Sequence, residues 1–223
     1  MAIRIKVAVI DDDKSVRAAL ARLIKSAGIE PSTYSSAKEF LADPGHEKID
    51  CALTDVRMPG LNGLELQKHL HITDPHISVV FITGHGDIPM SVEAMKEGAV
   101  DFLEKPVDNE ALLAAIRRAA ERSQATRASR DELNELKRRY ELLTPRERQV
   151  FALVTAGFLN KQIGFDLGTA EKTVKAHRAK VMEKMKAGSL ANLVLMAQAL
   201  GLQPLMGKPS NVRPQDSYRQ LSV

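Results

Sequence analysis

The stretch LTDVRMPG, residues 53–60, places a single carboxylate, Asp55, between a short apolar run and the turn-forming pair Pro59-Gly60. An apolar run of this kind, ended by a turn, is typical of a strand that is buried on both faces. In open parallel sheets, ligands bind beyond the carboxyl ends of the strands. The position of Asp55 therefore predicts a polar site at one edge of a parallel sheet.

Strand patterns and helix patterns alternate through the first half of the chain. We expect five strands, at residues 5–10, 31–35, 51–54, 78–83 and 101–103. Between them, Gly28 ends one helical pattern, and Asp87 caps a second that Gly98 ends. A last helix opens at Asp108. Five such units with apolar strands predict an α/β fold, a doubly wound five-stranded parallel sheet of the flavodoxin-like type.

Polar side chains also follow the first, fourth and fifth predicted strands, namely Asp11, Asp12, Asp13, Thr83 and Lys105. Carboxylates gathered at one edge repel one another unless a cation lies among them, and Mg²⁺ suits such oxygen ligands. If Asp11 and Asp12 hold the metal, Asp55 can attack phosphorus and form an acyl phosphate. Lys105 and Thr83 would then donate to the phosphoryl oxygens.

The two halves of the chain carry opposite net charges. Residues 1–123 contain 15 Lys and Arg against 19 Asp and Glu, whereas residues 124–223 contain 17 against 9. A basic second half favours a polyanionic partner, although a merely solvated basic surface is the alternative.

The location expected for the chain is the cytoplasm. The single cysteine, Cys51, excludes a disulfide within the chain and fits a reducing compartment. The first residues lack a signal-peptide pattern, and polar residues interrupt the apolar tract near 190–206. We therefore expect no membrane segment.

Residues 123–143 are highly charged but keep helix formers, which predicts a helical linker. A narrow apolar stripe runs along it, made of Leu133, Leu136, Tyr140 and Leu143. Two interpretations remain open: the stripe pairs with a second copy in a coiled coil, or it packs only on its own domain.

Residues 144–202 contain four short helical patterns. Thr144-Pro145-Arg146-Glu147 forms a capping box, and a helix from Asn160 is joined by a tight turn to a second that is rich in Lys and Arg. This pair predicts an all-α helix-turn-helix domain. The tail at 203–223 is predicted to be disordered.

In the second helix of this pair, Val174, Val181 and Met185 share the inward face. Long cations on the outward face can reach phosphates or guanine edges, and small alanines admit close contact with thymine methyl groups. The candidate DNA contacts are Asn160, Lys161, Lys172, Thr173, Lys175, Ala176, Ala179, Lys180 and Lys184, the last nearer the flank.

Several segments carry a family resemblance. VIDDD, LTDVRMPG, FITGHGD and AVDFLEKP resemble the receiver domain of bacterial two-component response regulators, over residues 4 to about 122. LTPRERQVFALVTAGFLNKQI and KTVKAHRAKVMEKM resemble the DNA-binding domain of the LuxR/FixJ (NarL) type. The domains implied are a receiver at 1–122, a linker at 123–143 and a DNA-binding domain at 144–202.

The resemblance also implies roles for individual residues. Asp55 is the phosphoacceptor, Asp11 and Asp12 are the acidic pair, and the backbone carbonyl of Arg57 is a further Mg²⁺ ligand beside Asp55. Lys105 binds the phosphoryl group, and Lys105-Pro106 is a cis peptide. Thr83 is the switch hydroxyl, and Phe102 is the aromatic residue that moves with it.

The function implied is that of a phosphorylation-dependent transcriptional regulator, which catalyses only its own phosphorylation and dephosphorylation. A sensor histidine kinase would donate the phosphoryl group. Two receivers would then pair through Val92, Met95 and Lys96, and the homodimer would bind inverted half-sites in double-stranded promoter DNA. RNA polymerase is a further candidate partner.

The DNA-binding half departs from the family pattern at the turn between its two key helices. Thr169 stands where an aliphatic residue is usual, and Ala170 takes a cap position often held by Ser or Thr. Gly164 replaces a common small alanine. We expect a less stable turn, with Thr169 as a shifted cap.

Two other functions compete with this one. Asp11-Asp12-Asp13-Lys14-Ser15 also fits the nucleophile motif of a haloacid-dehalogenase-type phosphatase, with Asp11 as nucleophile, but the second acidic metal motif is missing. The other is a constitutive DNA-binding regulator whose acidic pocket holds only a structural metal.

Overall fold

The computed structural model describes residues 5–84 and 88–202. The chain divides into two compact units, Met1–Ser129 and Arg130–Val223, and the boundary falls inside one long helix, α5 (Asn109–Glu141). The expected cap at Asp87 and the expected tail at 203–223 lie outside the described residues. Within the described ranges, no helix is both long and apolar enough to cross a bilayer.

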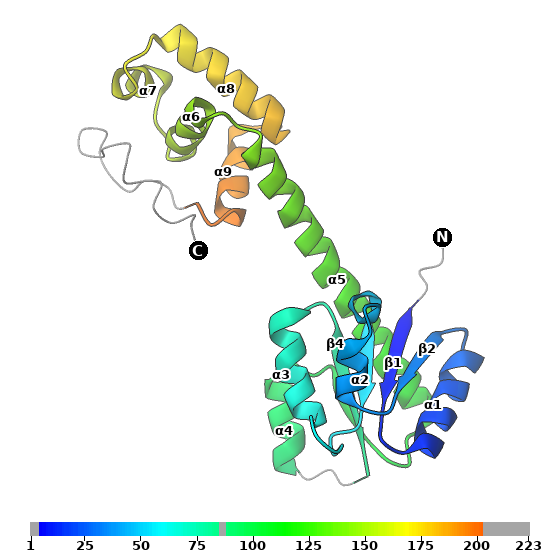
Figure 1. Ribbon diagram of the computed structural model, residues 1–223. Coiled ribbons are helices and arrows are strands. Elements are labelled where there is room, and N and C mark those ends of the chain that lie inside the picture. The colour runs from blue at the N-terminus through cyan, green and yellow to red at the C-terminus, as the bar shows by residue number, and fades with distance from the viewer. Residues whose placement is uncertain (1–4, 85–87, 203–223) are drawn as a thin grey trace. The chain divides into compact units, whose positions relative to one another are not determined.

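A five-stranded parallel sheet forms the centre of the first unit (Figure 1). Its strands are β1 (Lys6–Ile10), β2 (Glu30–Tyr34), β3 (Cys51–Thr54), β4 (Ser78–Thr83) and β5 (Asp101–Glu104). They lie side by side in the order β2-β1-β3-β4-β5, and every neighbouring pair is parallel. The predicted strands agree with these bounds to within one residue, and the doubly wound topology is confirmed.

Alternation along each strand sends neighbouring side chains to two separate cores. Val7 and Val9 face a layer made by α1 (Lys14–Ser26) and α5. Ala8 and Ile10 face the opposite layer, which contains α2 (Ala37–Ala42), α3 (Gly63–Thr73) and α4 (Ile88–Lys96). Burial on both faces explains why these strands are apolar throughout.

Side chains at the helix starts satisfy backbone N–H groups that have no partner within the helix. Asp13 caps α1, and Asn62 and Glu65 form a reciprocal capping box at α3. Asp108 accepts from the N–H of Ala111 at 2.8 Å, which confirms the predicted start of α5. The polar residues after these strands therefore fix where each helix begins.

Helix α5 stays attached to the first unit beyond residue 122. Arg127 donates from Nη2 to the carbonyls of Glu47, in the 3₁₀ turn η1 (His46–Lys48), and Ile49, at 3.1 and 2.8 Å. The same Nη2 lies 3.6 Å from the buried carboxylate of Asp50, which also accepts from Ser123 Oγ at 3.5 Å. The first turns of the predicted linker are thus held at the amino end of β3.

The second unit is helical. After the last turns of α5 it contains α6 (Pro145–Thr155), α7 (Asn160–Asp166), α8 (Glu171–Met185) and α9 (Leu190–Ala199). Leu136 and Tyr140 of α5 pack against its core, and the Tyr140 and Phe151 rings meet edge to face with centroids 5.4 Å apart. Three residues of the apolar stripe, Leu136, Tyr140 and Leu143, therefore pack on their own domain, and pairing with a second copy stays an open alternative.

Candidate functional site

The carboxyl ends of β1, β3 and β5 bring three charged side chains together. The ammonium of Lys105 lies 2.7 Å from Asp11 Oδ2 and 2.7 Å from Asp55 Oδ2. Asp11 is 3% exposed, Asp55 13% and Lys105 22%, so the cluster is largely shielded from water but remains accessible at one side. Of the polar residues expected at the sheet edge, the structure thus joins Asp11, Asp55 and Lys105 by direct contacts.

Backbone N–H groups orient both carboxylates. The N–H of Arg57 donates to Asp55 Oδ1 at 3.0 Å, and the N–H of Asp13 donates to Asp11 Oδ1 at 2.8 Å. Burial lowers the pKa of Lys105, but its hydrogen bonds with Asp11 and Asp55 outweigh that effect and raise the pKa above the usual value. Lys105 is therefore a cation held between two carboxylates at this edge.

Thr83 and Phe102 lie beside this cluster. Thr83 ends β4 and is buried, and its carbonyl accepts from the N–H of Lys105 at 2.8 Å. The Lys105-Pro106 peptide is cis, as expected. Phe102 in β5 is half-buried, and its ring lies 6.0 Å from that of Phe81 between centroids. The two residues are thus on adjacent strands, one at the charged cluster and one in the core beside it.

Some of the carboxylates expected to bind a divalent metal ion lie together at this site. Asp11 and Asp55 present carboxylate oxygens toward one point, which is the chemistry Mg²⁺ prefers. Asp12 is exposed, and across residues 5–84 and 88–202 no three His, Cys, Asp or Glu side chains are arranged around a common metal position. Two of the three expected carboxylates therefore converge, with Lys105 as their cation.

Asp13 has a different role from its two neighbours. Its Oδ1 accepts from the N–H groups of Ser15 and Val16, at 2.7 and 3.3 Å, as the cap of α1. These hydrogen bonds lower its pKa. Asp13 is thus engaged in helix capping, so the motif considered for the phosphatase alternative holds only one carboxylate, Asp11, bound to Lys105.

Gly63 is a site residue that sequence reasoning missed. A Cβ built there would lie 2.3 Å from the carbonyl oxygen of Asp55 and 3.0 Å from the Phe81 ring. Only glycine allows the start of α3 to approach the phosphoacceptor candidate this closely. The neighbouring Asn62-Glu65 capping box is visible in the sequence, but the approach of Gly63 to Asp55 is a tertiary contact.

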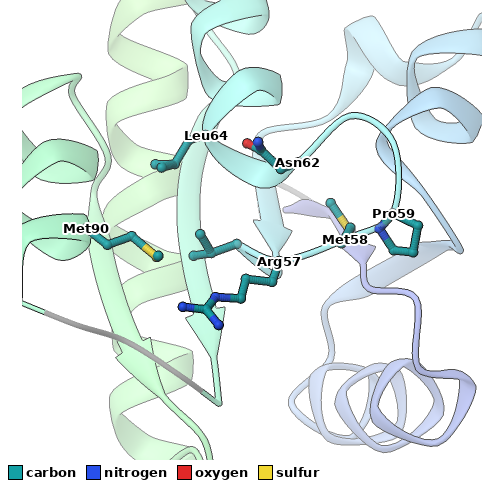
Figure 2. Close-up of a pocket in the computed structure, with 7 residues that line it drawn as sticks. Arg57, Met58, Pro59, Asn62, Leu64 and Met90 are labelled. Carbon is teal, nitrogen blue, oxygen red and sulfur yellow. The ribbon is translucent and has the colours of Figure 1, made fainter.

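A pocket of about 430 Å³ adjoins the charged cluster (Figure 2). Figure 2 shows Leu64 of α3 and Met90 of α4 on one side, and Arg57, Met58 and Pro59 of the loop after β3 on the other. The lining is mainly apolar, and Arg57 is the residue that this pocket shares with the polar site.

In the second unit, α7 and α8 form the helix-turn-helix. Val174, Val181 and Met185 are buried, which confirms the predicted inward face. Seven of the candidate DNA contacts are exposed, namely Lys161, Lys172, Thr173, Lys175, Ala176, Ala179 and Lys180. Asn160 is half-buried, and its Oδ1 accepts from Arg178 at 3.3 Å.

Lys184 differs from the other candidate lysines of α8. Its ammonium lies 2.6 Å from Glu147 Oε2 and 3.1 Å from the carbonyl oxygen of Leu142, so it binds protein groups instead of lying free for a phosphate. The partner carboxylate is only 3% exposed. The helical wheel placed Lys184 at the flank but contained no information about a partner 37 residues away.

The turn between α7 and α8 depends on Gly164. A Cβ there would lie 2.8 Å from the Thr169 carbonyl oxygen, and the Thr169 N–H donates to the Gly164 carbonyl at 2.8 Å. Ala170 is the cap residue of α8 and provides no side-chain hydrogen bond. The expectation that Thr169 acts as a shifted cap is therefore wrong.

Ala170→Ser is expected to stabilise the second unit by about 1 kcal/mol. The backbone of Ala170 is already extended, with φ −70° and ψ 146°, so a serine oxygen could accept from the first turn of α8 without rearrangement. Denaturant unfolding measures the change, with the exposed Ala176→Ser as control because a serine there lies inside the helix. Equal stability of Ala170→Ser and wild type would contradict it.

Comparison with known proteins places this geometry in a family. Residues 7–117 match the model of the response regulator receiver domain, and residues 141–197 match that of the bacterial regulatory proteins of the luxR family. Nodulation protein W of Bradyrhizobium diazoefficiens is 46% identical over 87% of this chain and 86% of its own. The transcriptional regulatory protein FixJ of Azorhizobium caulinodans is 47% identical over 88% and 93%. This chain belongs to the response regulators.

Solved structures agree with this assignment. The response regulator StyR is 44% identical and superposes with a TM-score of 0.76, over 88% of this chain and 99% of its own. Full-length FixJ from B. japonicum is 39% identical with a TM-score of 0.51, over 89% and 98%. The chain is thus a response regulator of the same type as FixJ, Nodulation protein W and the response regulator protein TodT of Pseudomonas putida, with a receiver domain and a LuxR-type DNA-binding domain. Its family is one of transcription regulators and not of classical enzymes.

Proposed function

We propose that Asp55 accepts a phosphoryl group from a sensor histidine kinase and that this modification controls DNA binding. The observation that carries the proposal is the convergence of Asp11, Asp55 and Lys105 at the carboxyl edge of the sheet. An oxygen of Asp55 attacks phosphorus, the phosphorus–nitrogen bond of the donor phosphohistidine breaks, and the imidazole leaves with the bonding electrons.

The residues around Asp55 stabilise the charge that develops during transfer. Lys105 moves from bridging two carboxylates to contacting the phosphoryl oxygens, and the Arg57 N–H holds the other Asp55 oxygen. Asp11 and Asp55, the Arg57 carbonyl and, after turning from solvent, Asp12 would hold Mg²⁺. When bound, Mg²⁺ neutralises part of the phosphoryl charge.

The phosphoryl group adds up to two negative charges beside Thr83. The Thr83 hydroxyl then turns toward it, and Phe102 turns inward into the space that the hydroxyl leaves. This repacking alters the surface of α4, where Val92 and Met95 are 44% and 46% exposed and Lys96 is also exposed. Two receivers pair through this surface and bring two copies of α8 to inverted half-sites.

Beryllofluoride, which mimics the phosphoryl group, is expected to tighten dimerisation of the wild-type protein by about 5- to 150-fold. Thr83→Ala should show little of this shift because the proposed relay starts at the Thr83 hydroxyl. Sedimentation of both proteins with and without beryllofluoride measures the change in dimerisation affinity. A wild type that stays monomeric, or a Thr83→Ala variant that dimerises equally well, would refute the coupling.

The exposed face of α8 supports contact with DNA by Lys172, Lys175 and Lys180. The Lys175–Glu171 ion pair, at 2.9 Å, lies on the surface with its two side chains 63% and 46% exposed. Such a pair adds little stability, so Lys175 can leave it for a base edge. Ala176 and Ala179 leave room for that approach.

Lys175→Ala should weaken binding to a selected DNA site by about 1–3 kcal/mol while changing binding to scrambled DNA much less. Lys180→Ala, at the edge of the same face, should lower both affinities alike. Fluorescence anisotropy with both duplexes measures the effects. If Lys175→Ala lowers the two affinities equally, Lys175 does not read a base.

The decisive experiment is selection of duplexes from a random library by the full chain, with and without beryllofluoride. The proposal expects a palindromic site enriched mainly in its presence. Equal enrichment in both arms would favour the constitutive alternative with a structural metal pocket. The setting we propose is the cytoplasm, with RNA polymerase as a further partner.

A further inference from the structure

Glu147 is a buried carboxylate at the start of α6. It is 2% exposed, and its Oε2 accepts from the N–H of Thr144 at 2.9 Å and from the ammonium of Lys184 at 2.6 Å. Burial raises its pKa, but the hydrogen bonds from Lys184 and Thr144 outweigh burial and lower the pKa overall. Glu147 is therefore an anion whose main counter-charge comes from α8.

The same lysine also reaches the end of α5. Lys184 donates to the carbonyl of Leu142 at 3.1 Å, and Arg148 of α6 donates to the carbonyl of Glu141 at 2.9 Å. The Arg148 guanidinium also lies over the Tyr140 ring, 5.3 Å from its centroid. The last carbonyls of a helix lack partners within it and carry partial negative charge, so cations bind there favourably. Two cations thus close the C-terminal turn of α5, one of them from the proposed recognition helix.

We propose that Lys184 is a positioning residue that fastens α8 to the C-terminal turn of α5 through Glu147, and that it does not contact DNA. Moving its ammonium to a phosphate would leave the Glu147 carboxylate buried without its main partner, which is strongly unfavourable. It would also remove the hydrogen bond from Lys184 to the carbonyl of Leu142. The pair consequently sets the direction of α8 relative to the end of α5. This inference rests on the proposed role of α8 in DNA recognition.

The salt dependence of DNA binding tests it. Removing one cation that binds a DNA phosphate reduces the slope of log K against log salt concentration by about 0.9. Lys180→Met, which removes an exposed cation from the same helix, should reduce the slope by about that amount. Lys184→Met should leave the slope of the full-length chain unchanged but lower the ratio of affinities for the selected and scrambled duplexes. A slope reduced as in Lys180→Met would overturn the proposal.

Glu147→Gln gives an independent test, since it keeps the Lys184 charge and nearly the same side-chain shape. A positioning role predicts that Glu147→Gln lowers the affinity ratio as Lys184→Met does, and that the double variant is no worse than either single one. If Lys184 instead bound phosphate, its release by Glu147→Gln would preserve or raise affinity for both duplexes, which would overturn the proposal. Should Lys184→Met fail to fold, the Glu147→Gln result decides alone.

Failure of the broader function looks different. If selection with wild type returns no preferred duplex, sequence-specific regulation is refuted. The slopes of Lys184→Met and Lys180→Met on scrambled DNA still decide whether Lys184 contacts phosphate.

Discussion

Asp55→Asn is expected to abolish phosphorylation of this response regulator. An amide oxygen is too weak a nucleophile to form the acyl phosphate, and Asn also removes the charge that Lys105 balances at 2.7 Å. Incubation with a small acyl phosphate and Mg²⁺, followed by mass-spectrometric mapping of the modified residue, measures the effect. Label should appear on Asp55 in wild type and fall below detection in the variant.

Asp13→Asn is the matched control. It changes a carboxylate at the same edge of the sheet, but asparagine is as good a helix cap as aspartate, so α1 should keep its start. Labelling should persist in this variant. Label on Asp11 in wild type, or persistent labelling of Asp55→Asn, would contradict the assignment of the phosphoacceptor.

Gly63→Ala is expected to destabilise the receiver by about 3 kcal/mol, at the upper end of typical overpacking costs. The added methyl group would lie 2.3 Å from a backbone oxygen, which has no flexible side chain to move aside. Because that oxygen belongs to Asp55, the variant should also be phosphorylated more slowly. Hydrogen exchange of the β3 amides in the full-length chain reports the local stability.

Gly84→Ala serves as the comparison, since a Cβ there has no atom within 4 Å and the backbone is not left-handed. The β3 amides of Gly84→Ala should exchange hydrogen at the wild-type rate. If Gly63→Ala is as stable as Gly84→Ala, the loop after β3 can move away from α3, and Gly63 does not constrain Asp55.

The sheet edge was predictable because parallel topology requires it. Once the apolar runs before Asp11, Asp55 and Lys105 are recognised as parallel strands, their carboxyl ends must meet, whatever the helices between them do. The inward face of α8 was predictable for a similar reason, since Val174 and Val181 differ by nearly two whole turns. The spacing of apolar residues along one helix is enough to predict which of its faces is buried.

Contacts between distant elements could not be predicted in this way. Lys184 looks like any flank lysine until α6 brings a buried Glu147 within 2.6 Å. Gly63 reads as an ordinary glycine near a helix start, and its closeness to Asp55 depends on how the loop after β3 folds. The apolar stripe through Leu136 and Tyr140 fits both a coiled coil and packing on its own domain, because both bury the same side chains.

The attachment of α5 at Arg127 determines where this protein can be cut. Trimming the receiver at residue 122 would remove both Ser123 and Arg127. Oδ1 of Asp50 and the carbonyls of Glu47 and Ile49 would then lose these hydrogen-bond donors and be exposed to water. The amino end of β3 would then fray, although every residue of the phosphorylation site is retained. A receiver prepared in isolation should extend to Ser129, and proteases acting on the folded chain should spare the peptide bonds between Ser123 and Arg127.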